Sequence, residues 1–482
     1  MSEVSSRLER AERFLAKHAV RVSAVLFVAA LIPRVYVATR WAHEAVWDGH
    51  YYHFGAQRIA EGHGYSDGRV TPQGVEWHPW CHYPVGYSGF LAIFYRIFGA
   101  SVSTGTLVGA LVGALTVLVV HRLALAHLSN VRALAAGLLC AAHPGLIMYA
   151  GLLMTEPLAA LGLVGAPLAY VKVLRMGGNY RPIGAAIAAG IVLGLTTLVR
   201  PQSLLVAPLI GLFARPTADG DEGLGRWKRG LIAAVVATVS CVAVVLPWTA
   251  RNCSVMDGCA FVSTNGGWNL AIGSSPHATG RFDAISGADG CREVTGQVQQ
   301  DRCWFNQGVR WIEADPKRYL SLVPKKLAYT FDHQSFAVGY LSQADPDAWP
   351  EERRARYRGV LSAVQYVLIA LSALGVTRRP RAGRFDVLAW APLLLLVGLF
   401  ANGVLSEPHT VWLVAVGVAL VGGARVFDAK DSGFVPYLAL TLGSLIVVHA
   451  VFFGEDRYQI VVTPALSLLA GAALGRRPGS RG

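Results

Sequence analysis

The chain has 482 residues, of which 53% are hydrophobic and only 15% are charged, and its mean hydropathy is +0.42. Because soluble proteins carry roughly a quarter charged residues, this composition excludes an ordinary soluble enzyme. The formal charge of +13 does not indicate nucleic-acid binding, since the Arg and Lys residues mark the ends of apolar runs instead of forming a patch on a soluble domain.

Apolar runs long enough to cross a hydrocarbon core as helices recur along the chain. Short patterned strands do not recur, so we expect an all-α polytopic membrane protein. About twelve spans are predicted, near 19–38, 103–121, 133–152, 157–174, 183–199, 202–214, 230–248, 359–376, 386–402, 409–424, 433–452 and 459–475. No small-residue cleavage site follows residues 19–38, which therefore read as a retained first helix rather than a signal peptide.

Basic residues predict the orientation of these spans, because short loops rich in Arg and Lys stay in the cytoplasm. Such clusters occur at both ends of the chain and between alternate spans, within 7–17, 122–132, 172–181, 226–229, 378–384 and 476–481. We therefore expect both termini on the cytoplasmic side of the cytoplasmic (inner) membrane. One cluster disagrees with this topology: Arg353, Arg354, Arg356 and Arg358 would lie outside.

This topology places two large segments, 39–102 and 249–356, on the outer face. It divides the chain into an N-terminal transmembrane catalytic module (1–250), an external loop domain (251–356) and C-terminal transmembrane helices (357–482). Residues 83–99 are apolar and aromatic, and we expect a helix lying in the outer interface. A true span is the alternative, but it would put Arg122 and Arg132 outside.

Four of the seven cysteines fall in the second external segment, where an oxidising compartment favours disulfides. Three connectivities are open, and the pairs close in sequence, Cys253–Cys259 and Cys291–Cys303, are favoured. Cys81 is left alone in the first external segment.

Charged residues at the predicted outer helix ends are the candidates for chemistry. Asp48 begins a helical stretch, where a plain N-cap is the alternative interpretation, and Glu156 begins the fourth span. Arg200, Arg251 and Arg457 also lie at outer ends, and snorkelling toward lipid headgroups explains any one of them equally well. Three arginines and two carboxylates on one face indicate a site for an anionic, lipid-borne substrate.

The order of the motifs carries a resemblance to a known superfamily. They are Asp48 followed by two Tyr, YPxGY at 83–87, MTEP around Glu156, Arg200-Pro201, PWxxRN at 247–252, NGGWNLAIGSSPHATG at 265–280 and RYQIVVTPAL at 457–466. Together they resemble the bacterial GT-C glycosyltransferases, in the branch of the protein O-mannosyltransferases and the lipid A aminoarabinose transferase. Asp48 matches that family's catalytic acid in the first external loop. His82 departs from the family, since the aminoarabinose transferases carry a functional Lys there.

The resemblance implies a GT-C fold and an inverting transfer of a sugar from a polyprenyl-phosphate donor. Independently, such a displacement needs a base for the acceptor proton, which Asp48 can be, assisted by Glu156, and cations for the phosphate leaving group. The expected substrate-binding residues are Tyr51, Tyr52, His82, Tyr83, Arg200, Trp248, Arg251, Arg457 and Tyr458. The partners are then the lipid-linked donor, membrane lipids and a glycan, lipid or protein acceptor, with no nucleic acid.

No cofactor is expected, although a divalent metal held by His78, Cys81 and His82 is a weaker alternative. Asp219 and Asp221 resemble the metal-binding acids of nucleotide-sugar transferases, but we interpret them as a solvated loop. A transporter or flippase is the main competing function, and it would place charges at mid-span. An oligosaccharide polymerase or ligase with a related fold is a third reading.

Overall fold

The computed structural model describes residues 2–41, 44–176, 181–214, 224–377, 387–428 and 431–474. In these ranges the chain is mostly helical, as predicted. The N-terminal half contains α1 (Ser2–Lys17), α2 (Ala19–Arg40), α3 (Asp48–Glu61), α4 (Val85–Phe98), α5 (Val102–His127), α6 (Asn130–Ala142), α7 (Pro144–Met148), η1 (Tyr149–Gly151), α8 (Glu156–Met176), α9 (Arg181–Val199), η2 (Pro201–Ala214) and α10 (Leu224–Val255).

The second half begins with short helices and ends with long ones. They are α11 (Gly266–Ser274), α12 (Gln297–Ala314), α13 (Pro316–Ser321), α14 (Val323–Phe331), α15 (Phe336–Ala344), α16 (Glu351–Val376), α17 (Val387–Leu405), α18 (Trp412–Ala424), η3 (Arg425–Phe427), α19 (Phe434–Val451), η4 (Asp456–Tyr458) and α20 (Gln459–Ala473). One feature was not predicted: β1 (Ser66–Thr71) and β2 (Gly74–Pro79) form an antiparallel hairpin in which Ser66 lies opposite Pro79.

Each of the twelve expected spans coincides with a helical segment, but the count of twelve is not confirmed. Among the described residues, seven helices are long and apolar enough to cross a membrane: α2, α5, α8, α9, α10, α16 and α19. An eighth span is possible if α6 and the segment 144–151, which are bent by 53° at their break, count as one. Of the other expected spans, η2, α18 and α20 are shorter, with 14, 13 and 15 residues, whereas α17 has 19 residues, as many as α9.

The apolar stretch at 83–99 forms α4, which has 14 residues. At about 1.5 Å per residue it extends only ~21 Å, short of a hydrocarbon core of roughly 30 Å. This length favours the expected short helix over the alternative of a true span.

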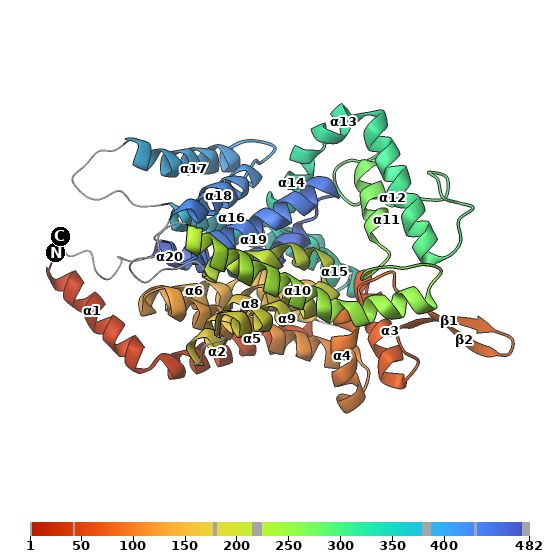
Figure 1. The fold of residues 1–482 in the computed structure, drawn as a ribbon, viewed down its shortest axis with the longest axis horizontal. Helices are drawn as coiled ribbons and strands as arrows, with labels where there is room; N and C mark the ends of the chain where they lie inside the picture. Colours follow the sequence, from red (N-terminus) through yellow and green to blue (C-terminus); the bar gives the residue numbers. More distant parts are fainter. Residues whose placement is uncertain are drawn as a thin grey trace.

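Elements of the two segments predicted to be external gather at one end of the bundle. In Figure 1, α1 lies at the left, whereas α3, the β1–β2 hairpin, α11 and α12 lie at the right. Long helices run between the two ends, with α8 packed on α5 and α9, α10 on α9 and η2, and α20 on α16 and α6. Small residues permit this close packing, as is usual in membrane bundles. A Cβ on Gly375 of α16, for example, would lie 1.9 Å from the carbonyl oxygen of Leu469 in α20.

One buried charge within a span has a structural explanation. Arg34 of α2 is fully buried, and its guanidinium donates to the carbonyl oxygens of Ala30 (2.8 Å), Ala141 (3.2 Å) and Cys140 (3.3 Å). The last two belong to the end of α6, where the break before α7 leaves carbonyls without helical partners. Arg34 therefore stabilises the broken helix pair.

The basic cluster that disagreed with the topology lies in the first two turns of α16. Arg353 packs its guanidinium over the rings of Trp349 (4.1 Å) and Trp41 (5.2 Å). Arg354, Arg356 and Arg358 pair instead with Glu351 and Glu352 in the same turns. These contacts show what holds the cluster, but the loop rule counts Lys and Arg rather than net charge, so the disagreement with the predicted topology stands.

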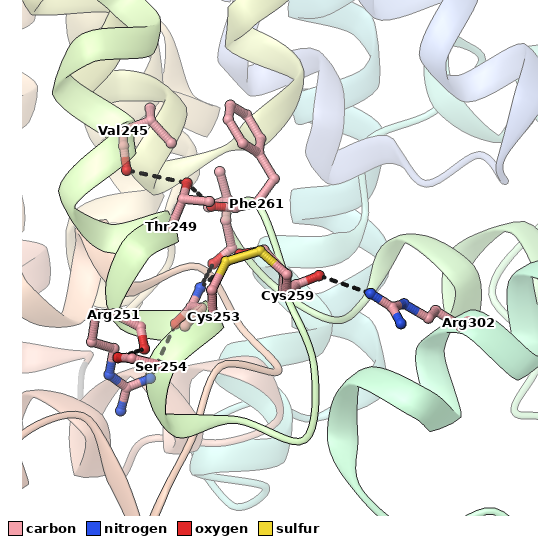
Figure 2. Close-up of a disulfide and its surroundings, with 11 residues drawn as sticks. Val245, Thr249, Arg251, Cys253, Ser254, Cys259, Phe261 and Arg302 are labelled. Carbon is pink, nitrogen blue, oxygen red and sulfur yellow. Dashed lines mark hydrogen bonds between the residues drawn. A yellow bond between two sulfur atoms is a disulfide. The ribbon is translucent and has the colours of Figure 1, made fainter.

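The favoured disulfide pairs are confirmed, because Cys253 is bonded to Cys259 and Cys291 to Cys303. Figure 2 shows the first pair closing the turn that follows α10, with Arg302 donating to the Cys259 carbonyl oxygen at 3.4 Å. Cys81 is a free, buried thiol.

Candidate active site

The turn before α3 is built to present Asp48. Trp47 has a φ of 49°, which is uncommon for a residue other than glycine, and its ring packs against Phe336 and Tyr340 of α15. The Tyr340 hydroxyl also accepts from the backbone N–H of Val46 at 3.2 Å. A Cβ on Gly49 would lie only 2.3 Å from that hydroxyl. Contacts with α15, in the segment 249–356, therefore set the position at which α3 begins.

Asp48 does not cap α3 with its side chain, so the plain N-cap interpretation is wrong. It is the first residue of the helix, and no side-chain capping bond is formed at the N-cap position. Its Oδ1 accepts from the hydroxyl of Tyr83 at 2.8 Å, and its Oδ2 accepts from Nη1 of Arg457 at 2.5 Å. Both carboxylate oxygens thus face the centre of the site rather than the helix.

Arg457, just before α20, bridges two carboxylates. Besides Asp48, it pairs through Nε with Glu455 Oε2 at 2.9 Å. Burial alone would raise the pKa of Asp48, but the charge of Arg457 and the hydrogen bonds from Arg457 and Tyr83 outweigh it and lower the pKa. Burial raises the pKa of Glu455, and the Arg457 charge opposes that rise only in part. Asp48 is therefore the more firmly ionised acid of the two.

A second acid–arginine pair lies beside the first. Glu156, at the start of α8, is fully buried and its Oε1 accepts from Arg200 Nη1 at 2.8 Å. Arg200, which lies between α9 and η2, also donates to the Thr155 hydroxyl at 2.9 Å. The ring of Tyr458 lies 5.2 Å from Arg200 Cζ and 5.0 Å from Arg457 Cζ. Tyr458 thus joins the two pairs, and neither arginine is directed at lipid.

The expected aromatic residues divide into an accessible and a buried group. Tyr51 is half exposed and stacks on Tyr83 (5.2 Å between ring centres) and Trp80 (6.0 Å). Tyr52 is only 5% exposed and packs edge-on against Tyr83 and Tyr87. The structure therefore leaves Tyr51 open to a ligand, whereas Tyr83 is partly buried beneath Tyr51 and Tyr52 packs behind Tyr83.

Arg251 and Trp248 of α10 are engaged elsewhere. Arg251 donates to the carbonyl oxygens of Tyr65 at 2.8 Å and Trp80 at 3.0 Å, and it lies 4.7 Å from the Trp248 ring. Trp248 donates to the Val262 carbonyl at 2.9 Å. Both residues fasten the ends of the β-hairpin and the loop after α10, so their predicted contact with substrate stays a prediction.

His82 lies near the site but supplies no firm charge. Its ring contacts those of Tyr83 (5.0 Å) and Trp268 (6.2 Å), and burial lowers its pKa against the opposing effect of Asp48. Within the described ranges, no three His, Cys, Asp or Glu side chains group as metal ligands would. Asp219 and Asp221 lie outside the described residues.

Two features of this region were not predicted. The first is the position of Glu455, since the sequence GEDRYQ holds three charges in a row and nothing in it indicates which of them turn inward. Asp456, the next residue, accepts from the backbone N–H of Phe336 at 2.8 Å and so caps α15. The second feature is an open cavity of about 380 Å³ between α11, α12 and Phe452, lined among others by Asp301, Arg302 and Phe305.

Comparison with known proteins supports part of this picture. Residues 82–248 match the family model described as dolichyl-phosphate-mannose-protein mannosyltransferase. That segment contains Tyr83, Glu156 and Arg200, whereas Asp48 and Arg457 lie outside it. No curated protein sequence is similar enough to match the chain.

The solved structures that the chain matches share little of its sequence. The AglB oligosaccharyltransferase of Archaeoglobus fulgidus, in complex with an inhibitory peptide and a dolichol-phosphate, is 14% identical, with a TM-score of 0.46 and coverage of 95% of this chain and 50% of its own. ArnT from Cupriavidus metallidurans bound to undecaprenyl phosphate is 15% identical, with a TM-score of 0.37 and coverage of 93% and 77%. The chain spans about half the length of the archaeal enzyme.

The fold and the site define a multi-pass helical membrane protein with a cluster of paired acids and arginines where several of its helices begin or end. The family match, over about a third of the chain, confirms the resemblance to the GT-C superfamily of glycosyltransferases.

Proposed function

We propose that this chain is an inverting glycosyltransferase that moves a sugar from a polyprenyl-phosphate donor to an acceptor at the outer face of the cytoplasmic membrane. The main observation behind this proposal is that Tyr83 and Arg457 both donate hydrogen bonds to the carboxylate of Asp48. The family match supports the donor class, because its members are named for a dolichyl-phosphate-linked sugar.

In the proposed reaction, the acceptor oxygen attacks the anomeric carbon of the donor sugar. The bond from that carbon to the phosphate oxygen breaks, its electron pair leaves with the polyprenyl phosphate, and the acceptor proton passes to Asp48. Because the leaving group is already a stable anion, it needs cations rather than a general acid. A single displacement of this kind inverts the anomeric configuration.

The ion pair with Arg457 keeps Asp48 ionised but also weakens it as a base. Phosphate binding resolves this conflict if Arg457 turns part of its charge toward the donor, since Asp48 then regains basicity when the acceptor is in place. Glu156, held by Arg200, orients the acceptor or supports Asp48 through Tyr458. Tyr51 provides an exposed ring for the sugar, and Tyr83 packs beneath it.

The division into a catalytic module (1–250), an external loop domain (251–356) and C-terminal helices (357–482) is part of the proposal. Contacts of the candidate site cross the proposed boundaries, because Trp47 packs on α15 and Asp48 pairs with Arg457. All three parts are therefore needed for a complete site.

A transfer assay tests the function. The purified protein in nanodiscs is given a radiolabelled polyprenyl-phosphate sugar and envelope extract, and we expect label in the acceptor together with one released polyprenyl phosphate per sugar moved. A set of hexosyl and pentosyl donors covers the sugar class. Movement of intact labelled lipid across a proteoliposome membrane, with no bond cleavage for any donor, would favour the transporter instead.

A further inference from the structure

In the proposed reaction, the donor phosphate must first bind to a cation of the site. Arg200 is paired with Glu156, and Arg457 lies between Asp48 and Glu455. Arg251 donates to two backbone carbonyls, and His82 has a lowered pKa because it is buried. The charge of each of these three arginines is thus shared with a carboxylate or with backbone carbonyls, although Nε of Arg200 makes no hydrogen bond, and His82 would have to gain a proton to bind phosphate.

We propose that Arg281 binds the phosphoester anion of the lipid-linked donor, an inference that rests on the proposed function. Arg281 follows Gly280 in the loop after α11, and it is exposed. Among the described residues, none makes an ion pair or a side-chain hydrogen bond with it. Its five N–H donors are therefore open to a ligand, and their planar fork matches phosphate oxygens.

The backbone fixes Arg281 beside the acid–arginine cluster. The carbonyl oxygen of Gly280 accepts from the N–H of Gly454 at 2.9 Å, which ties the loop to the residue preceding Glu455. The next residue, Phe282, packs edge-on against Phe453 with 5.8 Å between ring centres. These contacts on both sides leave Arg281 little freedom to move away from the site.

The guanidinium also has a defined direction. Its Cζ lies 5.7 Å from the ring centre of Tyr329 in α14, a contact that orients the planar group without using its N–H donors. Its charge reaches the site, since it is among the influences that lower the pKa of Glu455 against burial. A ring contact that holds an arginine without satisfying it is suited to an anion-binding group.

The test measures binding of polyprenyl phosphate, without sugar, to the full chain in phosphatidylcholine nanodiscs. Arg281→Ala should raise the apparent Kd about tenfold or more, as loss of charge-assisted hydrogen bonds does, and Arg281→Lys should restore part of the affinity. Arg310→Ala is the matched control, because Arg310 is an exposed arginine of α12, and it should bind as the wild type does. Equal binding by Arg281→Ala and wild type would overturn the assignment.

A second arm separates the two sources of a phosphoester. Phosphatidylglycerol should compete for the Arg281-dependent signal far less well than polyprenyl phosphate, and equal competition would overturn the assignment to the donor. In the transfer assay, Arg281→Ala should raise the KM for donor with little change in kcat. If the wild type transfers no sugar but Arg281→Ala weakens the binding of polyprenyl phosphate, the proposed function is contradicted and this inference is supported.

Discussion

Arg457 and Asp48 lie 409 residues apart in the sequence, yet Arg457 Nη1 is 2.5 Å from Asp48 Oδ2. The pair joins the first external segment to the turn that begins the last helix. Because Glu455 takes the Nε side of the same guanidinium, Arg457 holds two carboxylates that would otherwise repel each other. The site therefore depends on contacts between the two ends of the chain.

Replacing Arg457 by Ala should lower turnover, whereas replacing Arg251 by Ala should lower the stability of the fold. Arg457→Ala leaves Asp48 and Glu455 without their shared cation and should cut turnover at least tenfold. Arg251→Ala removes the hydrogen bonds to the Tyr65 and Trp80 carbonyls, of which Tyr65 keeps only the bond from Trp80 N–H, and this loss should destabilise the fold by roughly 1 kcal/mol or more. Apparent melting temperature and single-turnover rate, measured on both variants, separate the two effects. A melting temperature unchanged by Arg251→Ala would contradict its anchoring role.

Two neighbouring glycines in α11 allow a controlled test of how closely α11 packs on α12. A Cβ on Gly267 would lie 1.9 Å from the Asp301 carbonyl oxygen, whereas a Cβ on Gly266 would meet nothing within 4 Å. Gly267→Ala should destabilise the protein by about 1–3 kcal/mol, as overpacking does, while Gly266→Ala should have little effect. Equal melting temperatures for the two variants would show that α11 and α12 are not packed this closely.

Much of the fold follows from local patterns. Apolar run length predicted where the helices lie, because the bilayer sets that length directly. It did not predict that the helix at 409–424 would have only 13 residues, nor the bend at the α6–α7 break. The β1–β2 hairpin was missed because a single two-stranded ribbon leaves only a weak alternation in the sequence.

The site was predictable in part for a comparable reason. Charged residues near helix ends can be read from the sequence, and Asp48, Glu156, Arg200 and Arg457 do come together. The motif around Arg251 looked equally suitable, yet its guanidinium is occupied by carbonyls from a loop more than a hundred residues earlier. Which donors are already engaged depends on long-range contacts that no local motif records.

The orientation of the bundle can be tested by cysteine labelling. Gln73 in the hairpin turn and Glu9 in α1 are exposed and lie at opposite ends of the molecule. The native free thiols Cys81, Cys140 and Cys241 are buried, so the wild-type chain gives a low background. A membrane-impermeant maleimide should label Gln73→Cys on intact cells and Glu9→Cys only after lysis. Labelling of both on intact cells would contradict the predicted topology.

Lys326 of α14 should make stability depend on pH. Burial, with a smaller effect of Arg318, lowers its pKa to about 7. The unfolded chain, with an ordinary lysine pKa near 10, then binds more protons than the folded one across that window, so stability rises with pH from about 7 upward. Lys326→Met should flatten this rise between pH 7 and 9. Lys325→Met is the control, because Lys325 is exposed, and an equal slope in Lys326→Met and wild type would contradict the expectation.

The most direct test of the central claim is single-turnover transfer by Asp48→Asn on purified protein in nanodiscs, with donor binding measured on the same sample. If Asp48 takes the acceptor proton, the rate should fall about 10²-fold or more while donor binding stays within a few-fold of the wild type. Asn keeps the size of the side chain and can still accept from Tyr83, so the change removes mainly the charge and the basic oxygen. Near-normal turnover by Asp48→Asn would contradict the account and shift the role of base to Glu156.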